Sequence, residues 1–96
     1  MVALVTGGTR GIGAAISIRL KQAGFTVAAS YCNDTETAEK FKEETGISVY
    51  QWWVENPEQC LDGIKRIETD LGPISVLVNN AGVTRDSMFH KMTESK

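Results

Sequence analysis

The chain has 96 residues, a length that fits one domain or part of one. With 42% hydrophobic and 23% charged residues, its composition is that of a globular protein and excludes a disordered, collagen-like or low-complexity chain. Lysine and arginine number 10 against 12 aspartates and glutamates, which gives a net charge of −2 without a basic run. We therefore expect no binding to nucleic acid.

Neither a membrane segment nor a metal site is predicted. The N-terminal apolar run, Met1 to Val5, is far shorter than the roughly 20 residues of a membrane-spanning helix, and it lacks the basic region of a signal peptide. We expect a cytoplasmic protein that does not contact the membrane. Cys32 and Cys60 lie far apart, without a CxxC motif or a histidine at ligand spacing, so we expect two inert thiols rather than a disulfide or a metal ligand.

The N-terminal third of the chain predicts a strand, a glycine-rich turn and a helix. Residues 1–6 form a continuous apolar run that ends in glycines, which is typical of a strand buried on both faces. The helix that follows ends at Gly24, a residue suited to a left-handed C-terminal stop. Its apolar positions have helical spacing: Ile12, Ala15, Ile16, Leu20 and Ala23.

The next part of the chain predicts a second strand and a second helix. Residues 25–30 are largely apolar, and the polar cluster at residues 33–35 offers N-caps for a helix that ends near Gly46. We expect Ala38 and Phe41 to be the core contacts of that helix.

A third strand, a third helix and a fourth strand follow. Residues 47–54 are rich in β-branched and aromatic side chains, and Asn56 with Pro57 supplies a cap and a first-turn proline for a helix that ends at Gly72. Residues 74–78 predict a buried strand. The buried stripe of the third helix is expected to be Cys60, Ile64, Ile67 and Leu71.

This alternation of strands and helices predicts an α/β fold of the doubly wound, Rossmann type, with a parallel sheet of strand order 3-2-1-4 in one domain, residues 1–96. Right-handed crossovers put two helices on one face and one on the other. The strand at residues 74–78 would then be an exposed apolar edge. We therefore expect further strands after Lys96, and a chain that is the N-terminal part of a longer domain.

The turn after the first strand has the spacing Thr6-Gly7-x-x-x-Gly11-x-Gly13. Glycines let the backbone approach a pyrophosphate, whose charge is met by the N–H groups and the dipole of the helix N-terminus. The position between a strand and a helix predicts a dinucleotide site. The alternative is a tight turn that binds nothing.

The end of the second strand indicates which dinucleotide is bound. NAD-binding folds usually place an acidic residue there for the ribose 2′-hydroxyl, but residues 30–33 contain none and the first acid is Asp34. Arg10 in the glycine-rich turn suits a 2′-phosphate, so we expect NADP(H) rather than NAD. The alternative for Arg10 is a solvated loop charge.

Together with Asn79-Asn80-Ala81-Gly82 after the fourth strand, the glycine motif resembles the short-chain dehydrogenase/reductase family over the whole chain. Residues 2–16, 70–86 and 88–93 are similar to its NADP-dependent acetoacetyl-CoA reductases of polyhydroxybutyrate biosynthesis. The resemblance implies NADPH-dependent reduction of a 3-oxoacyl-CoA to the (R)-3-hydroxyacyl-CoA. The alternatives are a 3-oxoacyl-[acyl-carrier-protein] reductase of fatty acid synthesis and a non-catalytic NADP-binding module.

The resemblance also implies a set of site residues. The cofactor-binding residues would come from the glycine-rich turn, from the ends of the second and third strands, and from the segment after the fourth. They are Gly7, Thr9, Arg10, Gly11, Ile12, Gly13, Cys32, Trp53, Val54, Asn80, Ala81, Gly82, Val83 and Thr84, with Asp86 as a substrate contact. For Asn79 and Asn80 a structural role, in which their amides satisfy loop backbone, is an alternative that is compatible with cofactor binding.

One residue departs from the family pattern. Where members usually carry an aspartate that accepts a hydrogen bond from the adenine amino group, this chain has Trp53. Indole is a donor without acceptor capacity. Trp53 either stacks on adenine or packs under the loop with Trp52, and the sequence leaves both open.

The catalytic serine, tyrosine and lysine of the family have no counterpart in the chain, and the resemblance implies that they lie beyond Lys96. No Tyr-x-x-x-Lys occurs, because Thr35 follows Tyr31 and Val54 follows Tyr50 at that spacing. We therefore expect these 96 residues alone to be inactive.

Two further residues near the end of the chain carry weaker expectations. His90 is expected to be a solvated loop residue, and Lys91 beside it is a candidate contact for coenzyme A phosphates. The resemblance further implies an acyl-CoA substrate and a homotetramer.

Overall fold

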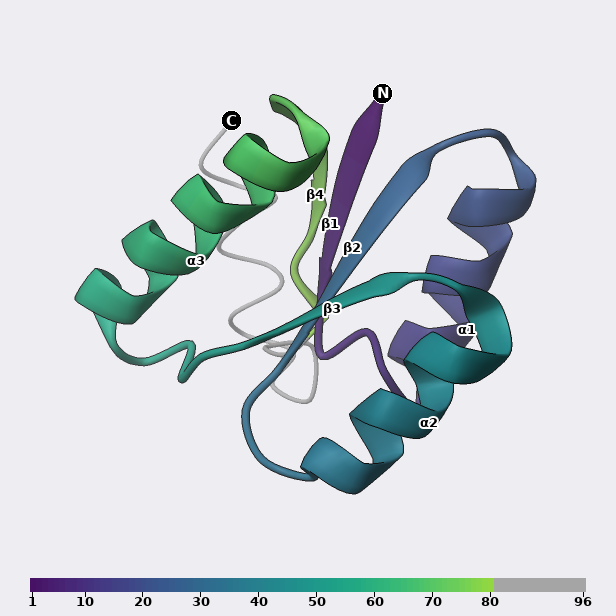
Figure 1. The fold of residues 1–96 in the computed structure, drawn as a ribbon, viewed down its shortest axis with the longest axis horizontal. Coiled ribbons are helices and arrows are strands. Elements are labelled where there is room, and N and C mark those ends of the chain that lie inside the picture. Colours follow the sequence, from purple (N-terminus) through teal and green to yellow (C-terminus); the bar gives the residue numbers. More distant parts are fainter. Residues whose placement is uncertain (81–96) are drawn as a thin grey trace, which may run out of the picture.

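Four parallel strands form one sheet with the order β3-β2-β1-β4 in the computed structural model, which describes residues 1–80 (Figure 1). The predicted Rossmann-type order is therefore confirmed. β1 and β2 pair in register from Val2 with Thr26 to Thr6 with Ser30. The strands are β1 (Val2–Thr6), β2 (Thr26–Tyr31), β3 (Ser48–Gln51) and β4 (Ile74–Val78).

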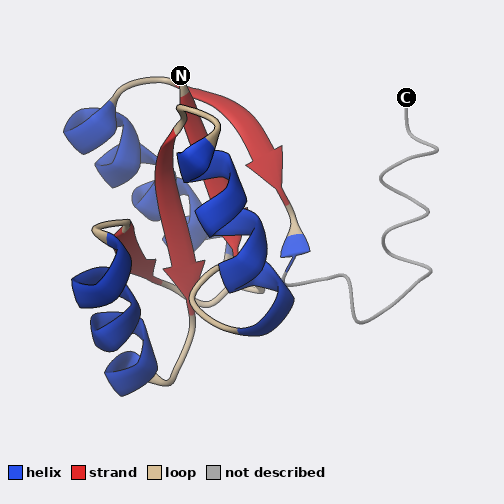
Figure 2. Ribbon diagram, turned by 90° about the vertical axis from the view of Figure 1, so that its right-hand side faces the viewer, coloured by secondary structure: helices blue, strands red, loops and turns tan. Residues whose placement is uncertain are grey.

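The helices are α1 (Gly11–Gln22), α2 (Thr35–Thr45) and α3 (Pro57–Leu71). Figures 1 and 2 show α1 and α2 on one face of the sheet and α3 on the other. This is the arrangement that right-handed crossovers require, because the chain steps from β1 to β2 to β3 in one direction and then returns past β1 to β4.

β3 is shorter than the predicted strand of residues 47–54. The last ladder bond runs from the N–H of Trp52 to the carbonyl of Tyr31 at 3.0 Å. The next N–H, that of Trp53, donates to Oε1 of Gln59 at 2.9 Å, and the carbonyl of Trp53 accepts from Asn56 at 3.0 Å. The backbone groups at the end of the predicted strand thus bond to the start of α3 instead of to β2.

Each face of the sheet carries its own core. The cluster under α3 consists of Val2, Leu4, Ala28, Tyr50, Trp52 and Ile67. Cys60, Ile64 and Leu71 are partly buried against it, so Ile67 is the one fully buried member of the predicted stripe. The cluster under α1 and α2 consists of Val5, Val27, Ala29, Phe41 and Ile47. Ala38 and Phe41 are buried, as predicted.

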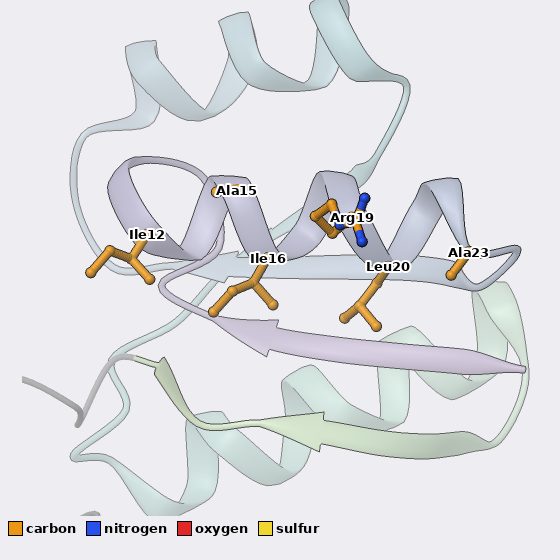
Figure 3. A pocket seen from close by; sticks show the side chains of 6 residues that line it. All are labelled: Ile12, Ala15, Ile16, Arg19, Leu20 and Ala23. Carbon is orange, nitrogen blue, oxygen red and sulfur yellow. The ribbon is translucent and has the colours of Figure 1, made fainter.

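The apolar positions of α1 differ in how deeply they are buried. The buried residues of this helix are Gly13 and Ser17, whereas Ile12 is 72% exposed. The apolar side chains line a groove of about 490 Å³ along the helix, with Ile16 and Leu20 extending toward the side on which β1 and β4 lie (Figure 3). The helical spacing thus predicted the helix correctly, and two of its apolar positions, Ile16 and Leu20, are partly buried against the cluster under α1 and α2.

β4 is the edge strand next to β1, as the sequence predicts. It has the same apolar character as β1, yet Leu77 is 57% exposed while all five residues of β1 are buried. Among the described residues, no helix has the length and apolar character needed to cross a membrane.

Candidate functional site

The four strands run parallel, so their carboxyl ends lie at one edge of the sheet (Figure 2). The glycine-rich turn follows β1 at this edge, and Gly7 and Gly11 adopt positive φ angles of 63° and 59°. The turn is fastened to the neighbouring strand, because the N–H of Gly8 donates to the carbonyl of Ser30 at 3.1 Å. In doubly wound folds this edge is the usual place for a ligand.

Helix α1 lies close to the turn because the residues in contact there are small. A Cβ added at Gly13 would collide with the carbonyl oxygen of Gly7, and one added at Gly8 would lie 2.7 Å from Oγ of Ser17. The hydroxyl of Ser17 is buried and lies 3.1 Å from the carbonyl oxygen of Gly8 and 2.9 Å from that of Gly13. These positions therefore admit no larger side chain without displacement of the helix.

The N-terminus of α1 presents backbone donors at the edge of the sheet. The N–H of Ala14 donates to the carbonyl of Arg10 at 3.1 Å, so the N–H groups of Gly11, Ile12 and Gly13 come before the helical ladder begins. No side chain caps the helix and its first turn contains no acidic residue. Unoccupied N–H groups and the positive end of the helix dipole favour an anion at this position.

The end of β4 is joined to the same turn. Nδ2 of Asn80 donates to the carbonyl of Gly7 at 3.1 Å, and the hydroxyl of Thr6 donates to Oδ1 of Asn79 at 3.1 Å. The structural role considered for the Asn80 amide, to satisfy loop backbone, is therefore confirmed. The bonds link β1 to β4, the two strands between which the strand order reverses direction.

Arg10 is paired with an acidic side chain. Its Nη1 lies 3.2 Å from Oδ2 of Asp34, with the two side chains 70% and 37% exposed. Asp34 caps α2 by accepting a hydrogen bond from the N–H of Thr37 at 3.3 Å. Hydrogen bonding by Thr37, followed by the charge of Arg10, lowers the pKa of Asp34, so the carboxylate is ionised at neutral pH. The Arg10 side chain is thus largely exposed to solvent, as expected if it were a solvated loop charge, and it also forms an ion pair with Asp34.

Asp34 is a residue that the sequence did not select for the site. The sequence indicated a helix cap in residues 33–35 and noted Asp34 only as the first acid after the second strand. The pairing with Arg10 joins residues 24 positions apart, and no local pattern reports such a contact.

The two tryptophans after β3 have different surroundings. Trp52 is 4% exposed and packs on Gly63 of α3, where an added Cβ would collide with its ring. Trp53 is 48% exposed. Trp52 is thus the indole that packs under the loop, and the alternative in which Trp53 is buried beside it is wrong. Val54 is 41% exposed at the same edge.

Two further predicted cofactor-binding residues, Thr9 and Cys32, lie in the described part of the chain. Thr9 is buried within the turn. Cys32, at the end of β2, is partly buried with a free thiol, and its carbonyl accepts from Nε2 of Gln51 at 3.0 Å. The described residues contain no group of side chains that could hold a metal ion.

The last segment named in the sequence analysis lies outside the described residues. This holds for the residues assigned to the nicotinamide side and the substrate, and for Lys96, beyond which the catalytic serine, tyrosine and lysine are expected. The residues concerned are Ala81, Gly82, Val83, Thr84, Asp86, His90, Lys91 and Lys96. The predictions made for these positions, and for the catalytic residues beyond Lys96, therefore stay predictions.

Comparisons with known proteins agree on a family. The model of a family described as short chain dehydrogenase matches residues 1–96. The chain is 66% identical to an acetoacetyl-CoA reductase of Shinella zoogloeoides over 92 residues, which cover 96% of this chain and 38% of the relative. It is 38% identical to a 3-oxoacyl-[acyl-carrier-protein] reductase of Staphylococcus aureus over 99 residues, which cover 98% of this chain and 40% of the relative.

Among solved structures, the chain is similar to a blue fluorescent protein from a metagenomic library crystallised in complex with NADPH. The two share 37% sequence identity with a TM-score of 0.75, over 82% of this chain and 35% of the other. This chain thus spans well under half the length of the proteins that it matches.

Proposed function

The chain belongs to the short-chain dehydrogenase family, and from this premise we propose that it supplies the cofactor-binding part of an NADPH-dependent acetoacetyl-CoA reductase. The observation that carries the substrate assignment is 66% identity to an acetoacetyl-CoA reductase, against 38% to a reductase of acyl-carrier-protein substrates. The activity would reduce the 3-keto group of a 3-oxoacyl-CoA and yield the (R)-3-hydroxyacyl-CoA, as in polyhydroxybutyrate biosynthesis.

The turn and the start of α1 would hold the pyrophosphate. Its residues fit this group, because the N–H groups of Gly11, Ile12 and Gly13 precede the helical ladder, and because Gly11 places no side chain in the open space beside the turn. An anion placed there meets backbone donors and the helix dipole at once.

The adenosine half would lie across the ends of β2 and β3. Arg10 would contact the 2′-phosphate, since a guanidinium presents several donors to phosphate oxygens, and Cys32 would line the ribose. Trp53 and Val54 would flank the adenine, with the half-exposed indole of Trp53 as a stacking surface rather than a hydrogen-bond acceptor.

The nicotinamide half would lie on the β4 side of the turn. When bound, NADPH supplies the hydride. The chain's own residues fix the cofactor's orientation: Asn80 holds the turn against β4 through its bond to Gly7, and we assign Ala81, Gly82, Val83 and Thr84 to the wall beside the nicotinamide ribose. Asp86 would contact the substrate. None of these residues is assigned a role in proton transfer, which we assign to family residues beyond Lys96.

The remaining parts of the proposal concern the whole protein. We assign it to the cytoplasm, with an acyl-CoA as its small-molecule partner and a homotetramer as its assembly. In this assignment residues 1–96 form the cofactor-binding part of a single domain.

The substrate is tested with the protein that contains this chain at its natural length. NADPH consumption is followed with acetoacetyl-CoA and with the same acyl group on an acyl-carrier protein. The proposal predicts a higher kcat/KM for acetoacetyl-CoA. A higher kcat/KM for the carrier-bound substrate would replace the proposal with fatty acid synthesis, and NADPH binding without turnover of either substrate would leave a non-catalytic module.

The cofactor assignment is tested by Arg10→Ala. Loss of the guanidinium should weaken NADPH binding about tenfold, or about 1.4 kcal/mol, and leave NADH binding nearly unchanged. Arg19→Ala removes an exposed arginine from the last turn of the same helix and is the matched control. Equal losses for NADPH and NADH in Arg10→Ala would contradict the contact with the 2′-phosphate.

A further inference from the structure

The ion pair between Arg10 and Asp34 connects the start of α1 to the start of α2 at the carboxyl edge of the sheet. Its partners are held differently. Asp34 has a left-handed backbone with φ of 52°, and its Oδ1 is occupied by the N–H of Thr37. The Arg10 side chain is 70% exposed. Arg10 is therefore the partner that can turn toward a ligand, while the carboxylate stays in place.

A guanidinium can contact two anions but does not remove the repulsion between them. Five N–H donors are available on Arg10, and its contact with Asp34 uses Nη1. Two anions in contact with one guanidinium lie less than about 8 Å apart, which is the Debye length at physiological ionic strength. Salt therefore does not fully screen the repulsion between them. An exposed ion pair contributes little to stability. Hence the carboxylate gains little by holding Arg10 and strongly repels a phosphate with two negative charges.

We infer that Asp34 competes with the cofactor's 2′-phosphate for Arg10 and so limits the preference of this protein for NADPH over NADH. The inference rests on the proposed function. A cofactor without the 2′-phosphate does not meet this repulsion. Arg10 thus favours NADPH, Asp34 reduces the preference, and Asp34 is a specificity-determining residue.

The test is Asp34→Asn in the protein of natural length, with both cofactors titrated by calorimetry. Asparagine is also a good N-cap and tolerates a left-handed backbone, so α2 is preserved. We expect the ratio of the Kd for NADH to the Kd for NADPH to rise about threefold or more. Asp62→Asn is the matched control, since it removes the same charge from an exposed ion pair, that with Arg66 at 3.5 Å on α3. It should leave the ratio unchanged.

Added salt separates this electrostatic effect from a structural one. The gain in Asp34→Asn should shrink as salt screens the carboxylate in the wild type. An unchanged or lower ratio in Asp34→Asn overturns the inference, because Asp34 would then have no influence or would position Arg10 for the phosphate. If the wild type binds NADPH, such a result leaves the proposed function intact. A wild type that binds neither cofactor overturns both.

Discussion

The two faces of the sheet are each covered by helices but are packed in different ways. Under α3, large side chains fill the space, with Trp52 and Ile67 fully or nearly buried. At the start of α1, the residues in contact with the turn are small: Gly8, Gly13 and Ser17 bring the helix against it. The contact of α3 with the sheet is thus aromatic, and the contact of the start of α1 with the turn is made of small residues.

The two contacts serve different purposes: the contact of α1 places the helix N-terminus, and the contact of α3 stabilises the fold. The N-terminus of α1 must lie at the end of β1 to present its N–H groups to a ligand, and a bulky side chain in the contact would push it away. The α3 face has no such restriction, so large apolar side chains can bury more area there. Changes on the α1 face should therefore affect ligand binding, and changes on the α3 face should affect stability alone.

The largest effect is expected for Gly13→Ala. The new Cβ would collide with the carbonyl of Gly7, which is backbone and cannot rotate away, so the turn and the helix must separate. We expect NADPH affinity to fall at least about 100-fold, or about 2.7 kcal/mol, as measured by titration calorimetry. Affinity within threefold of the wild type would show that the close contact is unnecessary for binding.

Gly63→Ala is the corresponding change on the α3 face. Its Cβ would collide with the ring of Trp52, and overpacking of this kind costs about 1–3 kcal/mol. We expect a loss of about 2 kcal/mol in the free energy of unfolding, measured by chemical denaturation, with unchanged cofactor affinity of the folded protein. A folded variant with weakened binding would contradict the separation between the faces.

Ser17→Ala tests the contact of α1 with the turn without adding volume. The mutation removes a buried hydroxyl that contacts two backbone carbonyls, and we expect the free energy of unfolding to fall by about 1.5 kcal/mol. The midpoint of thermal unfolding and the denaturant midpoint should both decrease. A stability equal to that of the wild type would show that these contacts add nothing.

Ser30→Ala is the matched control on β2, with the smallest expected effect. Ser30 is also buried, but its hydroxyl has no hydrogen-bond partner among residues 1–80. Replacing an unsatisfied hydroxyl by hydrogen should change the free energy of unfolding by no more than about 0.5 kcal/mol, or increase it. A loss as large as that of Ser17→Ala would indicate an additional partner for the Ser30 hydroxyl.

The sequence predicted the sheet order and the glycine-rich turn because their signals are local. The apolar spacing of α1 indicated a helix but did not report its most buried positions, which are Gly13 and Ser17. A glycine that is buried to allow a close approach carries no hydrophobic signal.

Two features of the candidate site required three-dimensional information. Trp52 and Trp53 are adjacent and chemically identical, and the end of β3 before them decides which is buried. Arg10 and Asp34 are brought together by the crossover from β1 to β2 and the start of α2. Both outcomes depend on where elements end, the property that residue patterns define least well.

The hydrogen bond from the Gly8 N–H to the Ser30 carbonyl attaches the turn to β2, as the ladder bonds attach β1. A loop that becomes ordered around a ligand loses conformational entropy at that moment, and affinity falls accordingly. Here that entropy is lost during folding, when β2 docks against β1. The amide of Gly8 should consequently exchange with solvent as slowly as the neighbouring strand amides, with or without a dinucleotide, and association should show no slow ordering phase.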